Sequence, residues 1–439
     1  MKAQSQLYKA ISKSMLGRYS VYAANLGSMM LLARVFTPEQ FGIIASVAVF
    51  STFFQMLSEA GLGPSIINID TLEKTDRNGI FGLTVIIGLC VGLLFYLATP
   101  VIVDFYKIEA LEQIIPYTSV GLFFFTCSIV PMAFLLREQL FFNISVIGLA
   151  SEIVSTGTTI VISKVTDPLH ALASKPLVLS ATGFLLAYLF SSKTEFGRPI
   201  FGTKFSAIKP LFSFSAYQFS FNLVNYFTRN LDNILVARYM GAAYLGVYDK
   251  AYQIMRYPLM LLTFAMTPAI QPVIRKYAND LEMVEVIHRD FTFKLSIAGA
   301  VVALIIFLFS DQMVLVLLGS SWSEVVPLIK ILALAIPVQV VLSTSGSFFQ
   351  ALNRTDLLFA CGVFSSIITA GGIVWGILQR DLTVLSWSIV ITFHINFILA
   401  YCVLYIVVFK KSPLGFLSRM LPAGLITAAM TASAMILKY

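Results

Sequence analysis

Charged residues are scarce in this 439-residue chain: Asp, Glu, Lys and Arg make up 12% of it, against 58% hydrophobic residues. Soluble domains carry about twice that charged fraction, so the composition excludes a soluble globular domain. We count about 13 apolar stretches of roughly 20 residues, each long enough to cross the hydrocarbon core of a bilayer. Their approximate limits are 14–34, 41–67, 79–103, 113–136, 143–164, 170–192, 209–236, 245–272, 291–310, 326–350, 357–378, 383–408 and 416–437.

Cysteine and histidine are rare as well, with four and three residues. All four cysteines lie inside predicted spans and no pair has metal-ligand or redox spacing, so we expect small core residues. The histidines lack the partner spacing of a metal site or a catalytic triad. There is no glycine-rich phosphate loop, and no loop is long enough for a soluble catalytic domain. We therefore predict a protein that is not an enzyme and that needs no metal ion or other cofactor.

The net charge of +8 follows membrane topology and does not indicate binding to nucleic acid. With the N-terminus inside the cell, most cations fall in inner loops: Lys74, Arg77, Lys193, Arg198, Lys204, Lys209, Arg275, Lys276, Arg289, Lys294, Lys410 and Lys411. The outer loops hold few: Lys107, Lys164, Lys175 and Arg380. This positive-inside pattern predicts a cytoplasmic N-terminus. The charged connection 273–290 is predicted to be either an amphipathic surface helix, through Leu281, Val284 and Ile287, or a solvated helical connector.

A repeat organises the chain. The run Leu32–Phe36, followed by Phe41-Gly42-Ile43, reappears as Val236–Met240 and Leu245-Gly246-Val247, an offset of about 204 positions that still relates Pro64 to Pro268. In a membrane protein such a repeat indicates a transporter built from two related halves, with the substrate site at their interface. Since both copies of the Ala-Arg motif fall at the outer ends of their spans, we predict parallel repeats.

The repeat predicts two pseudo-symmetric six-helix lobes and one or two extra C-terminal helices. The expected limits are 1–192 for the first lobe, 193–208 for a cytoplasmic linker, 209–410 for the second lobe and 411–439 for the additional span.

Polar residues follow one face of the predicted seventh span. Gln218, Asn222, Asn225, Arg229 and Asp232 are spaced 4, 3, 4 and 3 apart, so they share one side of a helix. A charged side chain at the bilayer centre costs at least about 2.5–3.5 kcal/mol, so this stripe must face protein or water. Subtracting the offset gives Ser14, Arg18, Val21, Asn25 and Ser28, of which four are polar. Two such seams predict a wet central cavity.

Other spans add polar residues to this predicted cavity: Asp249, Lys250, Gln253, Arg256, Gln339, Ser343, Gln350, Gln55, Glu59 and Glu152. One alternative is that the charges only pair as scaffolding, Arg229 with Asp232 and Asp249 with Arg256. Because arginine favours bidentate contact with phosphate, the seams predict a cargo that carries a phosphate or an acidic sugar.

Several runs resemble the polysaccharide transporter family: Leu32–Gly42, Gly61-Leu62-Gly63, Leu136-Arg137, Arg229–Asn233, Ala237-Arg238, Gly241, Leu245–Tyr248, Pro258, Pro268 and Gln350–Thr355. The family contains the Wzx-type flippases, in the superfamily of the multidrug extruders and the peptidoglycan-precursor flippase. The resemblance implies V-shaped lobes in the bacterial inner membrane. It also implies ion-gradient-driven transfer of undecaprenyl-pyrophosphate-linked oligosaccharide from the inner to the outer leaflet, for lipopolysaccharide, capsule or exopolysaccharide assembly. Such proteins usually have 12 or 14 spans, where we count 13.

On this reading, the substrate-binding residues are predicted to be Arg18, Asn25, Gln218, Asn222, Asn225, Arg229, Lys250, Gln253 and Arg256, with cations on the pyrophosphate and amides on sugar hydroxyls. A coupling ion, proton or sodium, is predicted to act through Glu59, Glu152, Asp232 or Asp249. Membrane lipids and polysaccharide assembly proteins are expected partners. The alternatives are a drug or metabolite cation antiporter of the same architecture, a membrane polymerase or glycosyltransferase, and a non-transporting scaffold.

Overall fold

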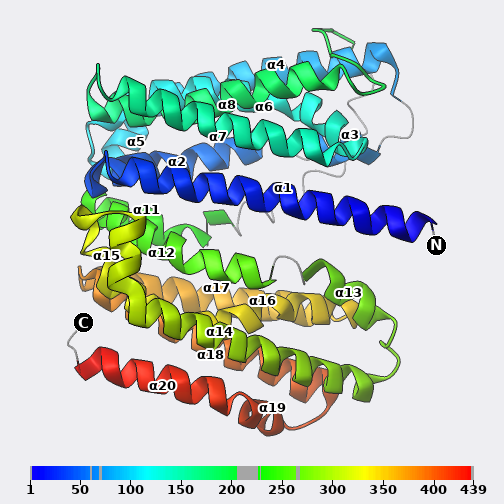
Figure 1. The fold of residues 1–439 in the computed structure, drawn as a ribbon, viewed down its shortest axis with the longest axis vertical. Coiled ribbons are helices and arrows are strands. Elements are labelled where there is room, and N and C mark those ends of the chain that lie inside the picture. Colours follow the sequence, from blue (N-terminus) through cyan, green and yellow to red (C-terminus); the bar gives the residue numbers. More distant parts are fainter. Residues whose placement is uncertain are drawn as a thin grey trace. The chain divides into compact units, whose positions relative to one another are not determined.

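The computed structural model describes residues 2–59, 62–68, 72–204, 226–227, 229–263 and 267–436, and in these ranges it contains helices and no strands (Figure 1). Within that part of the chain, eight helices are long and apolar enough to cross a membrane, or nine if the bent pair Val325–Ala333 and Ile336–Ala351 is one span. The prediction of a polytopic all-α membrane protein is confirmed. Most of the predicted stretch 209–236 lies outside the described residues.

The chain divides into two compact units, Met1–Gly246 and Val247–Tyr439. The first unit extends past the predicted linker 193–208 because helix α11 (Leu231–Tyr239) packs on helices α2 (Pro38–Glu59) and α5 (Thr99–Tyr106). The division into lobes at 192 and 209 stays a prediction.

Long helices dominate the first unit. Besides α2, its long helices are α1 (Lys2–Ala33), α4 (Lys74–Leu97), α6 (Leu111–Arg137), α7 (Phe141–Ile162) and α8 (Pro168–Ser191), and a short helix α3 (Leu62–Asn68) follows α2. Of these, α2, α4, α6, α7 and α8 are among the helices that could cross a membrane, and they overlap the second to sixth predicted spans. Helix α1 overlaps the first predicted span but is not among those helices. Helix α6 packs along α4 and α8, and α7 packs along α1 and α8. Leu62, Ile66, Phe81, Val130 and Phe134 are buried in one apolar cluster that joins α3, α4 and α6.

The second unit has more breaks in its helices. Its elements are α12 (Ala242–Thr263, which begins in the first unit), α13 (Thr267–Arg275), α14 (Leu281–Leu317), η2 (Ser320–Trp322), α15 (Val325–Ala333), α16 (Ile336–Ala351), α17 (Thr355–Leu378), α18 (Leu382–Val403), the π-helical segment η3 (Leu404–Phe409), α19 (Leu414–Arg419) and α20 (Leu421–Ile436). Helices α15 and α16 meet at 56°. Pro337 lies in the first turn of α16, where its missing N–H leaves no lost hydrogen bond.

Helix α14 replaces the predicted connector. Asp280 caps it by accepting a hydrogen bond from the backbone N–H of Met283 at 2.9 Å, so the helix begins at Leu281 and continues into the span. Val284 is fully buried, which excludes a solvated connector over these turns. The 37 residues of α14 span about 55 Å, longer than the roughly 30 Å core of a bilayer.

Two glycines that are related by the repeat pack directly on each other's helix. A Cβ atom added at Gly42 in α2 would lie 1.7 Å from the carbonyl oxygen of Ala242, and one added at Gly246 in α12 would lie 1.8 Å from that of Pro38. The Pro38–Ala242 and Gly42–Gly246 pairs both differ by 204 positions. The sequence motif therefore marks a close helix crossing to which each copy of the repeat contributes one glycine.

We predict opposite effects for two glycine-to-alanine substitutions in this unit. Gly42→Ala should lower stability by about 1–3 kcal/mol, because its methyl group overlaps a backbone carbonyl. Gly157→Ala in α7, where an added Cβ meets no atom within 4 Å, should gain about 0.5–1 kcal/mol from helix propensity. Thermal unfolding in detergent measures both. Equal effects of the two substitutions would contradict the crossing.

Candidate functional site

Part of the predicted site lies outside the described structure. Gln218, Asn222 and Asn225 are outside the described residues, and so is the side chain of Arg18 in α1. The predicted polar seam of the seventh span is therefore described only from Tyr226 onward.

The polar seam of α1 meets a polar face of α7. The hydroxyl groups of Ser28 and Thr156 are 2.6 Å apart and buried, and Asn25 is half-buried one turn earlier in α1. The buried residues of α7 are nearly all polar: Ser151, Glu152, Ser155, Thr156 and Thr159, with the apolar Ile147. This face explains how the weakly apolar α1 packs along α7, because Thr156 bonds the buried hydroxyl group of Ser28.

Glu152 forms a buried ion pair with Lys175. The lysine Nζ lies 2.7 Å from Oε1 of Glu152, and the two side chains are 22% and 7% exposed. The prediction that Lys175 lies in an outer loop was wrong. Asp167 caps α8 by accepting from the N–H of Leu169, so α8 begins at Pro168 and Lys175 lies two turns inside it, where only an anion compensates its charge.

Three predicted site residues of α12 form one network. Lys250 is buried, and its Nζ donates to Oδ2 of Asp249 at 3.0 Å and to Oε1 of Gln253 at 3.2 Å. Asp249 thus pairs with Lys250, whereas the alternative considered from the sequence paired it with Arg256. The Lys250 ammonium group bonds the residue before it and a residue one turn later in α12, so the exposed Arg256 is not needed to balance the charge of Asp249.

The remaining predicted residues differ in exposure. Asp232 is buried, and its Oδ1 accepts a hydrogen bond from the N–H of Asn233 at 2.8 Å. Arg229, Arg256 and Glu59 are exposed. The two arginines therefore present their guanidinium groups at the surface of their own units, as a binder of anions requires.

The second Ala-Arg motif lies beside α5. The guanidinium carbon of Arg238 is 5.8 Å from the centre of the Phe105 ring. The adjacent Asp104 accepts a hydrogen bond from Lys107, and this bond, with the Coulombic attraction of Lys107 and of Arg238, lowers the pKa of the Asp104 carboxyl.

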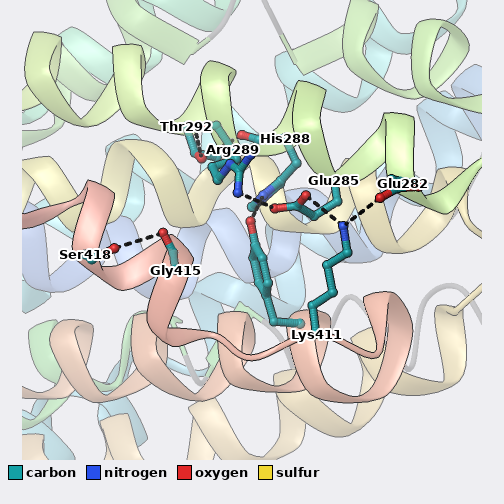
Figure 2. A network of polar contacts seen from close by, with 9 residues as sticks. Glu282, Glu285, His288, Arg289, Thr292, Lys411, Gly415 and Ser418 are labelled. Atoms are coloured by element: carbon teal, nitrogen blue, oxygen red, sulfur yellow. Dashed lines mark hydrogen bonds and ion pairs between the residues drawn. The ribbon is translucent and has the colours of Figure 1, made fainter.

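A polar cluster of the second unit was missed by sequence reasoning (Figure 2). Lys411 Nζ lies 3.3 Å from Oε2 of Glu285 and 3.7 Å from Oε1 of Glu282, and Nη1 of Arg289 lies 3.5 Å from the other oxygen of Glu285. Glu285 is buried, and two cations compensate its charge. Of these, Lys411 ties α14 to the segment after η3. The i,i+4 spacing of Glu285 and Arg289 could have predicted their ion pair from the sequence. The contact of Glu285 with Lys411, 126 positions away, could not have been predicted in this way.

His288 is buried at the centre of this cluster. Its Nδ1 lies 3.1 Å from the Tyr405 hydroxyl, and the rings of Phe348, Tyr401, Tyr405, Phe409 and Phe416 surround it at centroid distances of 4.7–5.9 Å. The imidazole packs as a core residue and joins α14, α16, α18, η3 and α19. In the described part of the chain no three His, Cys, Asp or Glu residues gather as a metal site would need.

We predict that Lys175→Met strongly destabilises the first unit. Removing one partner of a buried ion pair leaves the other charge unpaired, which costs about 3–5 kcal/mol. The double variant Glu152→Gln/Lys175→Met should recover most of that loss, because it removes both charges. Lys107→Met is the matched control, since Lys107 and Asp104 are largely exposed and exposed pairs contribute at most about 1 kcal/mol. Similar unfolding temperatures for Lys175→Met and Lys107→Met would show that the pair does not hold α7 on α8.

Comparisons with known proteins identify relatives that cover most of the chain. The chain is 26% identical over 382 residues to the teichuronic acid biosynthesis protein TuaB of Bacillus subtilis, covering 87% of this chain and 78% of that one. It is 25% identical over 401 residues to the lipopolysaccharide biosynthesis protein WzxC of Escherichia coli, and the alignment covers 88% of this chain and 78% of that one.

Solved structures share the fold. The lipid II flippase MurJ in an inward closed conformation aligns with a TM-score of 0.70 and 12% identity over 95% of this chain and 98% of that one. An inward-facing multidrug resistance MATE transporter of the MOP superfamily aligns with a TM-score of 0.69 and 14% sequence identity. The alignment covers 92% of this chain and 95% of that one. The family model described as "Polysaccharide biosynthesis protein" matches residues 31–327, more than half of the chain. The chain therefore belongs to the polysaccharide biosynthesis protein family, as its sequence motifs predicted.

Proposed function

We propose that this protein is a flippase that moves undecaprenyl-pyrophosphate-linked oligosaccharide from the inner to the outer leaflet of the bacterial inner membrane. The observation that carries the proposal is the family match over residues 31–327, in a chain that has the fold of a lipid II flippase over 95% of its length. The names of the relatives support a polysaccharide cargo, since they refer to teichuronic acid and lipopolysaccharide biosynthesis. The N-terminus is cytoplasmic in this proposal.

Cations bind the pyrophosphate in this proposal. Arg229 and Arg256 are exposed, and a planar guanidinium group matches phosphate oxygens in pairs. Arg18 and Lys250 complete the set, with Lys250 held in place by Asp249 and Gln253. The amide side chains of Asn25, Gln218, Asn222, Asn225 and Gln253 bind sugar hydroxyls.

Among the four coupling candidates we favour Glu152. It is a buried carboxylate whose charge is balanced by one lysine, so a proton or sodium ion that binds Glu152 changes the net charge of the α7–α8 contact. Asp232 is also buried, Asp249 is paired with Lys250, and Glu59 is exposed. Glu152 is therefore the candidate whose neutralisation most directly alters how two long helices pack.

We predict that Arg229→Gln and Arg256→Gln each weaken flipping of the cargo. Loss of a charge-assisted hydrogen bond costs about 1.5–3 kcal/mol, which corresponds to roughly a 10- to 150-fold higher apparent KM. The assay is reconstitution in proteoliposomes with lipid-linked oligosaccharide, followed by the access of an impermeant sugar-modifying reagent. Arg380→Gln, at an exposed turn between α17 and α18, is the control.

Two outcomes would contradict separate parts of that proposal. Wild-type protein that moves no lipid-linked oligosaccharide but exports a cationic dye would identify a drug exporter. Arginine variants that behave like Arg380→Gln, in a wild-type background that does flip the cargo, would remove Arg229 and Arg256 from the site and leave the function standing.

We predict that the Glu152–Lys175 pair is needed for gradient-driven flipping. An imposed proton or sodium gradient should accelerate flipping by wild-type protein several-fold and should not accelerate the folded double variant Glu152→Gln/Lys175→Met. The matched control, Asp311→Asn/Lys330→Met, removes a pair in the second unit whose Nζ–Oδ2 distance is 3.0 Å. Full acceleration in the Glu152 double variant would move the coupling site elsewhere.

A further inference from the structure

The second unit contains an apolar cavity beside its last helix. The cavity has a volume of about 630 Å³ and lies between α20 and the helices α14, α16 and α18, with Ser296, Val341, Phe397, Met420, Gly424 and Thr431 in its wall. This volume is within the range of about 300–1,000 Å³ found for ligand sites. Leu421 and Met435, which also line it, are 58% and 65% exposed, so the cavity opens along α20.

Helix α20 presents mainly small side chains to this cavity. Gly424, Thr427, Ala428, Thr431 and Ala432 line it at spacings that put them on one side of the helix. A Cβ atom added at Gly424 meets no atom within 4 Å. A side chain at position 424 would therefore extend into the cavity.

Two cations, Lys410 and Arg419, lie in the segment that joins η3 to α20. Arg419 falls between Leu417 and Met420, which both line the cavity. Arg419 and Lys410 are exposed and make no side-chain hydrogen bond or ion pair within the described part of the chain, whereas Lys411 is held by Glu285 (Figure 2). Two exposed cations thus have no side-chain partner that competes for an anion, and Arg419 adjoins the cavity wall along the chain.

We propose that this cavity binds one acyl chain of an anionic phospholipid, whose phosphate is held by Arg419 and Lys410. The combination of free cations with an apolar cavity fits a lipid that has both parts, because a free phosphate would leave the cavity empty. Basic pockets between membrane helices on the cytoplasmic side are suited to anionic head groups, which are enriched in that leaflet. The bound lipid fastens α20 to α14, α16 and α18.

The test measures lipid binding to the purified full-length chain, by native mass spectrometry and by the rise in unfolding temperature on adding phosphatidylglycerol or phosphatidylcholine of identical chains. Wild-type protein should retain phosphatidylglycerol and gain stability from it, with little effect of phosphatidylcholine. Arg419→Gln/Lys410→Gln should bind phosphatidylglycerol at least tenfold more weakly. Gly424→Phe should fill the cavity without a backbone clash and abolish binding.

The control variant is Gly371→Phe, in α17, where an added Cβ also meets no atom within 4 Å but which does not line the cavity. Equal phosphatidylglycerol binding by Gly424→Phe and Gly371→Phe would overturn the proposal. So would stabilisation of equal size by inorganic phosphate alone, or a dimer that Gly424→Phe dissociates, because the occupant would then be a free anion or a second copy of this chain.

A cargo with a prenyl chain is the remaining rival for the cavity. If Gly424→Phe raises the KM for lipid-linked oligosaccharide while phosphatidylglycerol binding is unchanged, the cavity serves transport and the proposal fails. Binding is measured without transport, so the lipid site and the proposed flippase function fail independently of each other.

Discussion

A polar group inside the hydrocarbon of a bilayer needs a partner within the protein, and this requirement determines where the polar residues of the chain lie. Hydroxyl groups in the spans donate hydrogen bonds to backbone carbonyls of their own helix. Ser46 donates to the carbonyl of Ile43, and Thr84 donates to that of Phe81. Charges need a stronger partner. Glu152 has Lys175 from the next helix, and Glu285 has one cation from its own helix and one from a distant segment.

The same requirement explains what the sequence could and could not predict about the fold. Hydropathy and the repeat predicted the six long helices of the first half closely, including the weakly apolar α1, because helix formation in a membrane is a local property of the chain. Lys175 was counted as an outer-loop cation although the predicted span 170–192 contains it, because its partner is 23 positions away in another helix and was not predicted. The break between α15 and α16 was also missed, because hydropathy predicts one span over 326–350 although Pro337 lies inside it.

The candidate site shows a similar division. Helical spacing identified Asp249, Lys250 and Gln253, which form one network, and the arginines at 229 and 256, which are exposed. Spacing along one helix does not specify which of several neighbouring cations pairs with a carboxylate. Arg256 was therefore considered from the sequence as the partner of Asp249, whereas the partner in the structure is Lys250. The cluster around Glu285 and His288 depends on contacts 117 and 126 positions apart, which periodicity within a single helix does not detect.

The crossing of Gly42 and Gly246 has a consequence for the history of the chain. Each glycine packs on the carbonyl four positions before the other, which is the geometry of an isologous interface between identical subunits. In an unfused ancestor of half the length, the two glycines of this contact would have been the same residue in two identical subunits. A substitution of that residue would therefore have changed both sides of the contact at once. After duplication and fusion the two sides mutate separately, and they have begun to diverge: Pro38 supplies one carbonyl, Ala242 the other, while both glycines remain.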